Sequence, residues 1–179
     1  LKAEEFTGDG SSESPYVIES AEELALLAYR VNHGEDMTGR YFVLGTDIDL
    51  TGAKWKPIGK AEAYLENKYT GKAFNGVFDG KNHSITGLDV SENGYLSGLF
   101  AIAEDKAVIK NLSVYGSVEN TNTDGYGTAA AVCAVNYGLI SNCKNHAEVT
   151  SVNCGGGIVG WNGAVNKTVT SSVITQCEN

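Results

Sequence analysis

The chain has 179 residues, enough for one domain, and its 13 basic and 22 acidic side chains give a net charge of −9. An acidic surface repels phosphate backbones, so nucleic acid is not expected as a partner. The 22 glycines and 2 prolines favour short strands and tight turns over a helical bundle. The longest apolar run, Ala129 to Val135, is far shorter than the roughly 20 residues that membrane insertion requires.

One amphipathic helix is predicted close to the start of the chain, over residues 20–31. Ser20 and Glu23 have the spacing of a capping box, in which each side chain accepts the backbone N–H of the other residue. Apolar residues follow at the intervals of a single helical face. That face consists of Leu24, Leu27 and Val31. Gly34 is suited to end the helix in the left-handed conformation.

From Tyr41 onward, short motifs recur and predict an all-β fold, a right-handed parallel β-helix in which repeats stack as a solenoid. The first set comprises Gly76-Val77-Phe78, Gly98-Leu99-Phe100, Ala131-Val132-Cys133 and Gly157-Ile158-Val159, at spacings of 22, 33 and 26 residues. The second set comprises Ile85 with Leu88, Ile109 with Leu112, Ile140 with Cys143 and Ile174 with Cys177. Two asparagine pairs accompany them, Asn111 with Asn142 and Asn136 with Asn162. Like residues are expected to form rows inside the solenoid.

These patterns divide one structural domain into residues 1–40, an N-terminal strand and capping helix, and residues 41–179, the β-helix repeats. The helix is expected to cover the first repeat, because an open solenoid end exposes unpaired strand edges. The second set of motifs stops at Cys177, in the middle of a repeat. We therefore expect this chain to be part of a longer protein with adjacent domains.

The order of several sequence blocks resembles a known family. The blocks are Phe6-Thr7-Gly8-Asp9-Gly10, Pro15-Tyr16-Val17-Ile18, Tyr41-Phe42-Val43-Leu44, Asp47-Ile48-Asp49-Leu50, Trp55-Lys56-Pro57-Ile58-Gly59, Phe74-Asn75-Gly76-Val77-Phe78-Asp79-Gly80 and Gly156 to Gly160. Together they are similar to the GLUG-motif repeat domains of bacterial surface proteins, which also occur in non-catalytic regions of IgA-cleaving proteases. The resemblance implies a β-helix on a secreted or cell-wall-attached protein, with no catalytic residues. The chain departs from the pattern at Ala130 to Ala134 and in an insertion over residues 163–172.

A carboxylate cluster is the main argument for an enzyme. Asp47 and Asp49 alternate on one predicted strand, Asp79 is a possible neighbour, and Lys54 is the basic residue within reach. A polysaccharide lyase or hydrolase on a β-helix uses such carboxylates as acid and base. The other interpretation is that Asp47 and Asp49 accept turn amides. We favour this second interpretation, and the chain is expected not to be an enzyme.

No metal site or cofactor is expected. The three histidines, His33, His83 and His146, lack ligand spacing, and the four cysteines form no C-x-x-C pair. Cys143 and Cys177 occupy equivalent positions in neighbouring repeats, so they either form a disulfide or stack as reduced thiols in an apolar row. Cys133 is predicted to fill the core beside Phe100 and Val159.

An insertion over residues 60–72 is the predicted binding surface. It carries Tyr64, Tyr69 and Lys68, and exposed tyrosines can stack on sugar rings or contact a protein partner. The alternative is a polar loop whose tyrosines pack back onto the solenoid. A second polar loop, residues 119–127, is assigned no role.

Together these features predict a non-catalytic module located outside a bacterial cell or on its surface. Its expected activity is adhesion, through host glycans, glycoproteins or polysaccharide. The first alternative is the lyase or hydrolase described above. The second is a structural spacer beside a catalytic domain such as a protease. Rigid repeats with variable loops suit all three roles.

Overall fold

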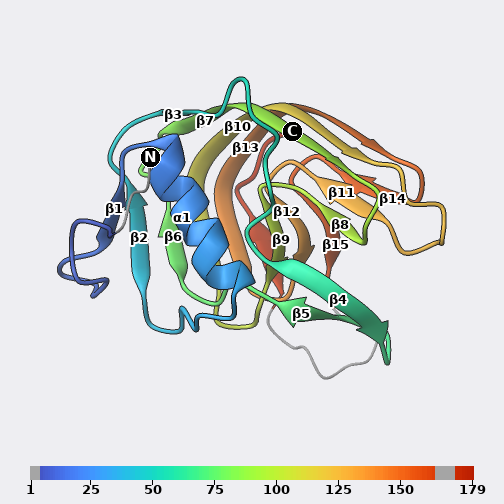
Figure 1. Ribbon diagram of the computed structural model, residues 1–179, viewed down its shortest axis with the longest axis horizontal. Helices are drawn as coiled ribbons and strands as arrows, with labels where there is room; N and C mark the ends of the chain where they lie inside the picture. The colour runs from blue at the N-terminus through green and yellow to red at the C-terminus, as the bar shows by residue number, and fades with distance from the viewer. Residues whose placement is uncertain (1–4, 164–171) are drawn as a thin grey trace.

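A computed structural model describes residues 5–163 and 172–179 as a mostly β protein with one helix (Figure 1). In the described part of the chain, no helix is long and apolar enough to cross a membrane. The predicted insertion at residues 163–172 falls almost entirely outside the described residues.

Helix α1, Ala21–Asn32, matches the predicted helix, and Ser20 is its N-cap. The Ser20 hydroxyl accepts the Glu23 backbone N–H at 3.2 Å. The reciprocal bond differs from the predicted capping box, because the Glu23 carboxylate accepts the N–H of Glu19 at 2.6 Å. Gly34 has a φ of 89°, which is the left-handed conformation expected just after the helix.

The largest sheet is built from parallel strands in the order β1-β2-β6-β10-β13-β16. Strand β7 also pairs with β10, and β3 pairs with β7. The bounds are β1 Tyr16–Ile18, β2 Tyr41–Leu44, β3 Ile48–Asp49, β6 Val77–Asp79, β7 Ser84–Glu92, β10 Val108–Asn120, β13 Leu139–Ser151 and β16 Val173–Thr175. Because β1 pairs in parallel with β2, this sheet begins before residue 41 and includes the N-terminal strand.

Two smaller parallel sheets complete the repeats. Their orders are β14-β11-β8 and β15-β12-β9. The bounds are β8 Leu96–Ser97, β9 Phe100–Ala103, β11 Thr128–Ala130, β12 Cys133–Asn136, β14 Cys154–Gly156 and β15 Val159–Asn162. Strands β10, β11 and β12 therefore each pair in register with their counterparts in the next segment, β13, β14 and β15. Three stacked segments, residues 77–103, 108–136 and 139–162, follow similar paths, which is compatible with a parallel β-helix.

The internal rows confirm most predicted motif pairs and correct two. Cys133 pairs with Phe100 and Val159, and Ile140 pairs with Ile109 and Ile174. The predicted row is wrong for the first motif of each set. Phe78 pairs with Ile109 and is not in the strand row of Phe100, although the two rings are in contact with centroids 5.3 Å apart. Ile85 pairs with Val114. The reason is that Gly-Val-Phe and Gly-Leu-Phe present the same inward apolar pattern, although they lie on different sheets.

The two ends of the stack are covered unequally. On one side α1 buries Leu24, Leu27 and Val31 against the main apolar core. On the other side the inward row is exposed in the last described strand. Ile140 is fully buried, whereas its neighbour Ile174 in β16 is 39% exposed.

Candidate functional site

The predicted insertion forms an antiparallel hairpin of β4, Lys60–Leu65, and β5, Lys68–Lys72, which projects from the body of the protein (Figure 1). Its turn residues Glu66 and Asn67 have φ angles of 51° and 64°, typical of a tight two-residue hairpin turn. Tyr64 and Tyr69 are directly opposite each other, with ring centroids 4.8 Å apart. Both rings therefore lie on one face of the hairpin.

Tyr69 is an anchor and is not exposed, because that face of the hairpin packs against the parallel strands. Its side chain is 3% exposed. The hydroxyl donates to the carbonyl oxygen of Tyr126 at 2.7 Å, and the Tyr69 backbone N–H donates to the hydroxyl oxygen of Tyr137 at 3.0 Å. Burial raises the pKa of Tyr69, and it raises the pKa of Tyr137 to about 12. The interpretation in which the loop tyrosines pack inward therefore applies to Tyr69.

Several half-buried or exposed rings lie around this anchor, and three of them form what we call the hairpin patch: Tyr64, Tyr126 and Trp161. The ring of Tyr64 is 5.1 Å from that of Tyr126 and 6.5 Å from that of Trp161. Tyr126 is 45% exposed, and the Trp161 indole N–H donates to the Gly163 carbonyl at 2.7 Å. The patch thus combines side chains from the hairpin, from the loop before β11 and from β15.

Two members of the hairpin patch, Tyr126 and Trp161, are not predicted from the sequence. Tyr126 lies in the loop over residues 119–127, to which no role was assigned, and Trp161 follows the Gly-Gly-Ile-Val-Gly block. A signal existed, since both are aromatic residues in Gly-rich segments. Their meeting with Tyr64 depends on how the segments stack, which residue spacing alone does not reveal.

Lys68 is held against the body of the protein. Its ammonium group lies 3.3 Å from the Glu104 carboxylate and 4.7 Å from the ring centroid of Tyr137. These contacts partner its charge, so Lys68 helps to fix β5 in place. Among the three residues predicted as ligand contacts, Tyr64 is the one that belongs to the hairpin patch.

The aspartates of the alternative enzyme site each accept hydrogen bonds near turns. Asp47 accepts the Ser84 N–H at 2.8 Å, and Asp49 accepts the Thr51 N–H at 2.9 Å. The Ser84 bond lowers the pKa of Asp47, and hydrogen bonds from the side chain and the backbone of Thr51 lower the pKa of Asp49. For Asp79, burial acts to raise the pKa, but hydrogen bonds from Asn111 and from the Lys81 backbone outweigh it and lower the pKa.

The three histidines lie apart, and each contacts a different partner. His33 stacks on Tyr29, His83 lies 3.1 Å from the Asp47 carboxylate, and His146 stacks on Tyr115. Within residues 5–163 and 172–179, no group of three His, Cys, Asp or Glu side chains is arranged to hold a metal ion. The predictions of no metal and no cofactor stay predictions.

All four cysteines are free thiols, including Cys143 and Cys177, which lie in neighbouring strand rows. Burial raises the pKa of Cys143 and of Cys133 to about 12. The Cys143 thiol donates to the Ser141 carbonyl at 3.4 Å, and Cys177 makes the equivalent bond to Thr175 at 3.3 Å. Stacked thiols are thus the arrangement in this structure.

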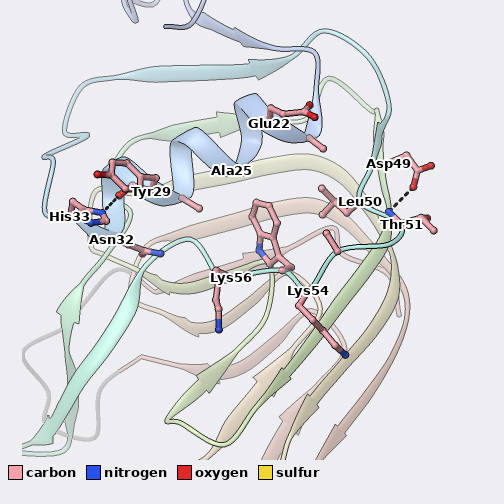
Figure 2. A pocket seen from close by; sticks show the side chains of 14 residues that line it. Glu22, Ala25, Tyr29, Asn32, His33, Asp49, Leu50, Thr51, Lys54 and Lys56 are labelled. Atoms are coloured by element: carbon pink, nitrogen blue, oxygen red, sulfur yellow. Dashed lines mark hydrogen bonds between the residues drawn. The ribbon is translucent and has the colours of Figure 1, made fainter. Parts of the chain in front are cut away.

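A hollow of about 640 Å³ lies between α1 and the segment of residues 49–56 (Figure 2). Alanines of α1 form one wall and leave room above Trp55, whose indole N–H is turned inward and donates to the Leu99 carbonyl at 3.1 Å. Tyr29 lies at one end, 58% exposed and stacked on His33. Figure 2 shows the Lys54 and Lys56 side chains directed away from the helix, so the middle of this helix groove is apolar.

Comparison with known sequences finds two long relatives. The chain is 26% identical over 159 residues to halomucin of Haloquadratum walsbyi, covering 87% of this chain and 2% of that protein. It is 33% identical over 145 residues to a provisionally named Gly-rich membrane protein of Evansella cellulosilytica, covering 75% of this chain and 15% of that protein. No family model matches the chain, so the GLUG-motif assignment stays a prediction.

Comparison with solved structures finds a similar fold in a protein of Bacteroides ovatus provisionally described as an immunoglobulin A1 protease. The TM-score is 0.63 at 20% sequence identity, over 96% of this chain and 49% of that one. This neighbour agrees with the predicted link to IgA-cleaving proteases. At this level of identity the likeness concerns the fold, and the chain spans about half of its neighbour.

Proposed function

We propose that this chain is a non-catalytic module on a bacterial surface or secreted protein, folded as a right-handed parallel β-helix, and that it binds glycans or glycoproteins. The parallel ladders support the β-helix, and crossover connections between parallel strands are almost always right-handed. The names of the relatives, a halomucin and a membrane protein, support a location at the cell surface.

The hairpin patch is the observation that carries the binding proposal. Sugar rings have apolar C–H faces, and tyrosine and tryptophan offer a large flat surface with little conformational freedom to lose. The rings of Tyr64 and Tyr126 are neighbours, with centroids 5.1 Å apart and planes tilted by 36°. The hydrogen bond between Tyr69 and Tyr137 fixes the hairpin beneath them. A preorganised patch loses less entropy on binding than a mobile loop does.

The test is a glycan array that includes mucin-type and plant polysaccharide epitopes, with the wild type and a Tyr64→Ala/Tyr126→Ala variant. We expect the wild type to bind a subset of glycans and the double variant to lose that binding. Tyr29→Ala is the control, because Tyr29 is an exposed tyrosine that lies in the helix groove, outside the hairpin patch. If the control loses binding equally, or if the double variant keeps it, the hairpin patch is not the binding site.

Two alternatives predict different results. A lyase or hydrolase would release products from a bound polysaccharide, and a hydrolase needs a general acid with a raised pKa. The pKa values of Asp47, Asp49 and Asp79 are lowered instead, which argues against their acting as that general acid. A structural spacer would bind nothing on the array, and Tyr64→Ala/Tyr126→Ala would change neither binding nor the function of a neighbouring domain.

A further inference from the structure

A second hollow, about 470 Å³, lies on the outer face of β10 and β13, and hairpin residues do not line it. Its lining side chains come in rows because both strands alternate their faces with a period of two. The rows are Asn82, Asn111 and Asn142, then Ser113 and Lys144, then Tyr115 and His146. Asn82 lies in a turn, whereas Asn111 and Asn142 lie within β10 and β13. We call this the amide hollow.

The amide row is rigid. Asn82, Asn111 and Asn142 have φ angles of 64°, 56° and 48°, left-handed values that asparagine tolerates better than most residues. The Asn142 amide nitrogen donates to the Asn111 side-chain oxygen at 2.8 Å, and the Asn111 amide donates to Asp79 at 2.9 Å. One wall of the hollow is therefore a fixed strip of amide groups.

The opposite wall is aromatic. The Tyr115 ring and the His146 ring stack with centroids 4.4 Å apart and planes 16° apart, and Tyr115 is 38% exposed. Amides and a hydroxyl on one side, with a stacked pair of aromatic rings on the other, match the hydroxyl groups and the apolar C–H groups of a sugar ring.

Lys144 gives the amide hollow a preference for a negatively charged ligand. Its ammonium group lies 3.0 Å from the Glu178 carboxylate, and the Glu178 side chain is 71% exposed. A carboxylate of the protein thus already occupies the anion position beside the hollow. Exposed ion pairs contribute little, so a ligand carboxylate can replace Glu178 at small cost. We propose that the amide hollow binds an acidic sugar, with its carboxylate on Lys144 and its ring against Tyr115.

The test is an NMR titration of the whole chain with methyl β-glucuronide and with methyl β-glucoside, which differ at the carboxylate. We expect shifts at Ser113, Lys144 and His146 with the glucuronide and weaker binding of the glucoside. Lys144→Gln should weaken glucuronide binding about two- to fivefold, as for an exposed charge pair. Glu178→Gln should strengthen it, because the competing carboxylate is gone.

Lys54→Gln is the matched control, since Lys54 forms a comparable exposed ion pair with Asp89 at 2.7 Å on another part of the surface. It should leave glucuronide binding unchanged. Equal binding of the two sugars, no shifts at the hollow, or the same loss in Lys54→Gln and Lys144→Gln would overturn the proposal. Binding at the hairpin patch is tested separately with Tyr64→Ala/Tyr126→Ala. One of the two proposed sites can therefore be disproved while the other stands.

Discussion

The hydroxyl oxygen of Tyr137 accepts the backbone N–H of Tyr69 at 3.0 Å, and this bond ties the β4–β5 hairpin to the end of β12. Both residues are buried. Within residues 5–163 and 172–179, β4 and β5 pair with each other alone. The position of the hairpin therefore depends on this bond, on the rings packed around it and on the Lys68–Glu104 ion pair.

Replacing Tyr137 with phenylalanine tests this bond. The Tyr69 N–H would lose its acceptor in a buried position, which costs about 1–3 kcal/mol in the free energy of unfolding. Urea denaturation measures the loss. Tyr115→Phe is the control, because an exposed hydroxyl should matter by about 0.5 kcal/mol or less. Equal midpoints for wild type and Tyr137→Phe would mean that the bond contributes nothing.

Alkaline pH should destabilise the protein through the same tyrosines. Burial raises the pKa of Tyr137 from 10.0 to about 12 and also raises the pKa of Tyr69. Folding therefore favours the protonated phenols, and this contribution is complete below pH 10 and lost as the pH rises toward 12. Urea midpoints across this range measure the slope. A Tyr69→Phe/Tyr137→Phe variant should show a shallower decline; an unchanged slope would assign the effect to other groups.

The left-handed position of Asn111 predicts a graded series. Asn111→Ala places a side chain without an amide at a φ of 56°, and it also removes the partner of Asp79 and Asn142. We expect a loss of about 1–3 kcal/mol in unfolding free energy. Asn111→Gly keeps the conformation accessible and should lose less. Thermal and urea unfolding of both variants measure the difference, and equal losses would mean that backbone strain is not involved.

Cysteine alkylation should divide the four thiols into two groups. Cys133 and Cys143 are buried, and their pKa values are raised to about 12, so they should react with iodoacetamide only after unfolding. Cys154 and Cys177 are partly exposed and should react in the native protein. Mass spectrometry of peptides after timed labelling measures this order. Protection of Cys143 and Cys177 together until a reductant is added would indicate a disulfide instead.

Residue spacing predicted the features that repeat and missed those that depend on stacking. Ile109, Ile140 and Ile174 form a row because each precedes an equivalent bend, and spacing alone identifies them. The motif pattern predicts the wrong strand row for Phe78, which pairs with Ile109, because an inward Gly-Val-Phe has the same pattern on every sheet. The meeting of Tyr126 with Tyr64, and the hollow above Trp55, arise from segments far apart in the chain.

The parallel pairing of β10 with β13 also determines how the chain must fold. Val108 pairs with Leu139, 31 residues later, so the loop around each repeat must close before these contacts form. Chains dominated by such distant pairings fold in milliseconds to seconds, far more slowly than helical proteins of similar stability. Because each segment pairs only with its neighbours, α1 and the first strands can serve as a template on which later segments are added one at a time.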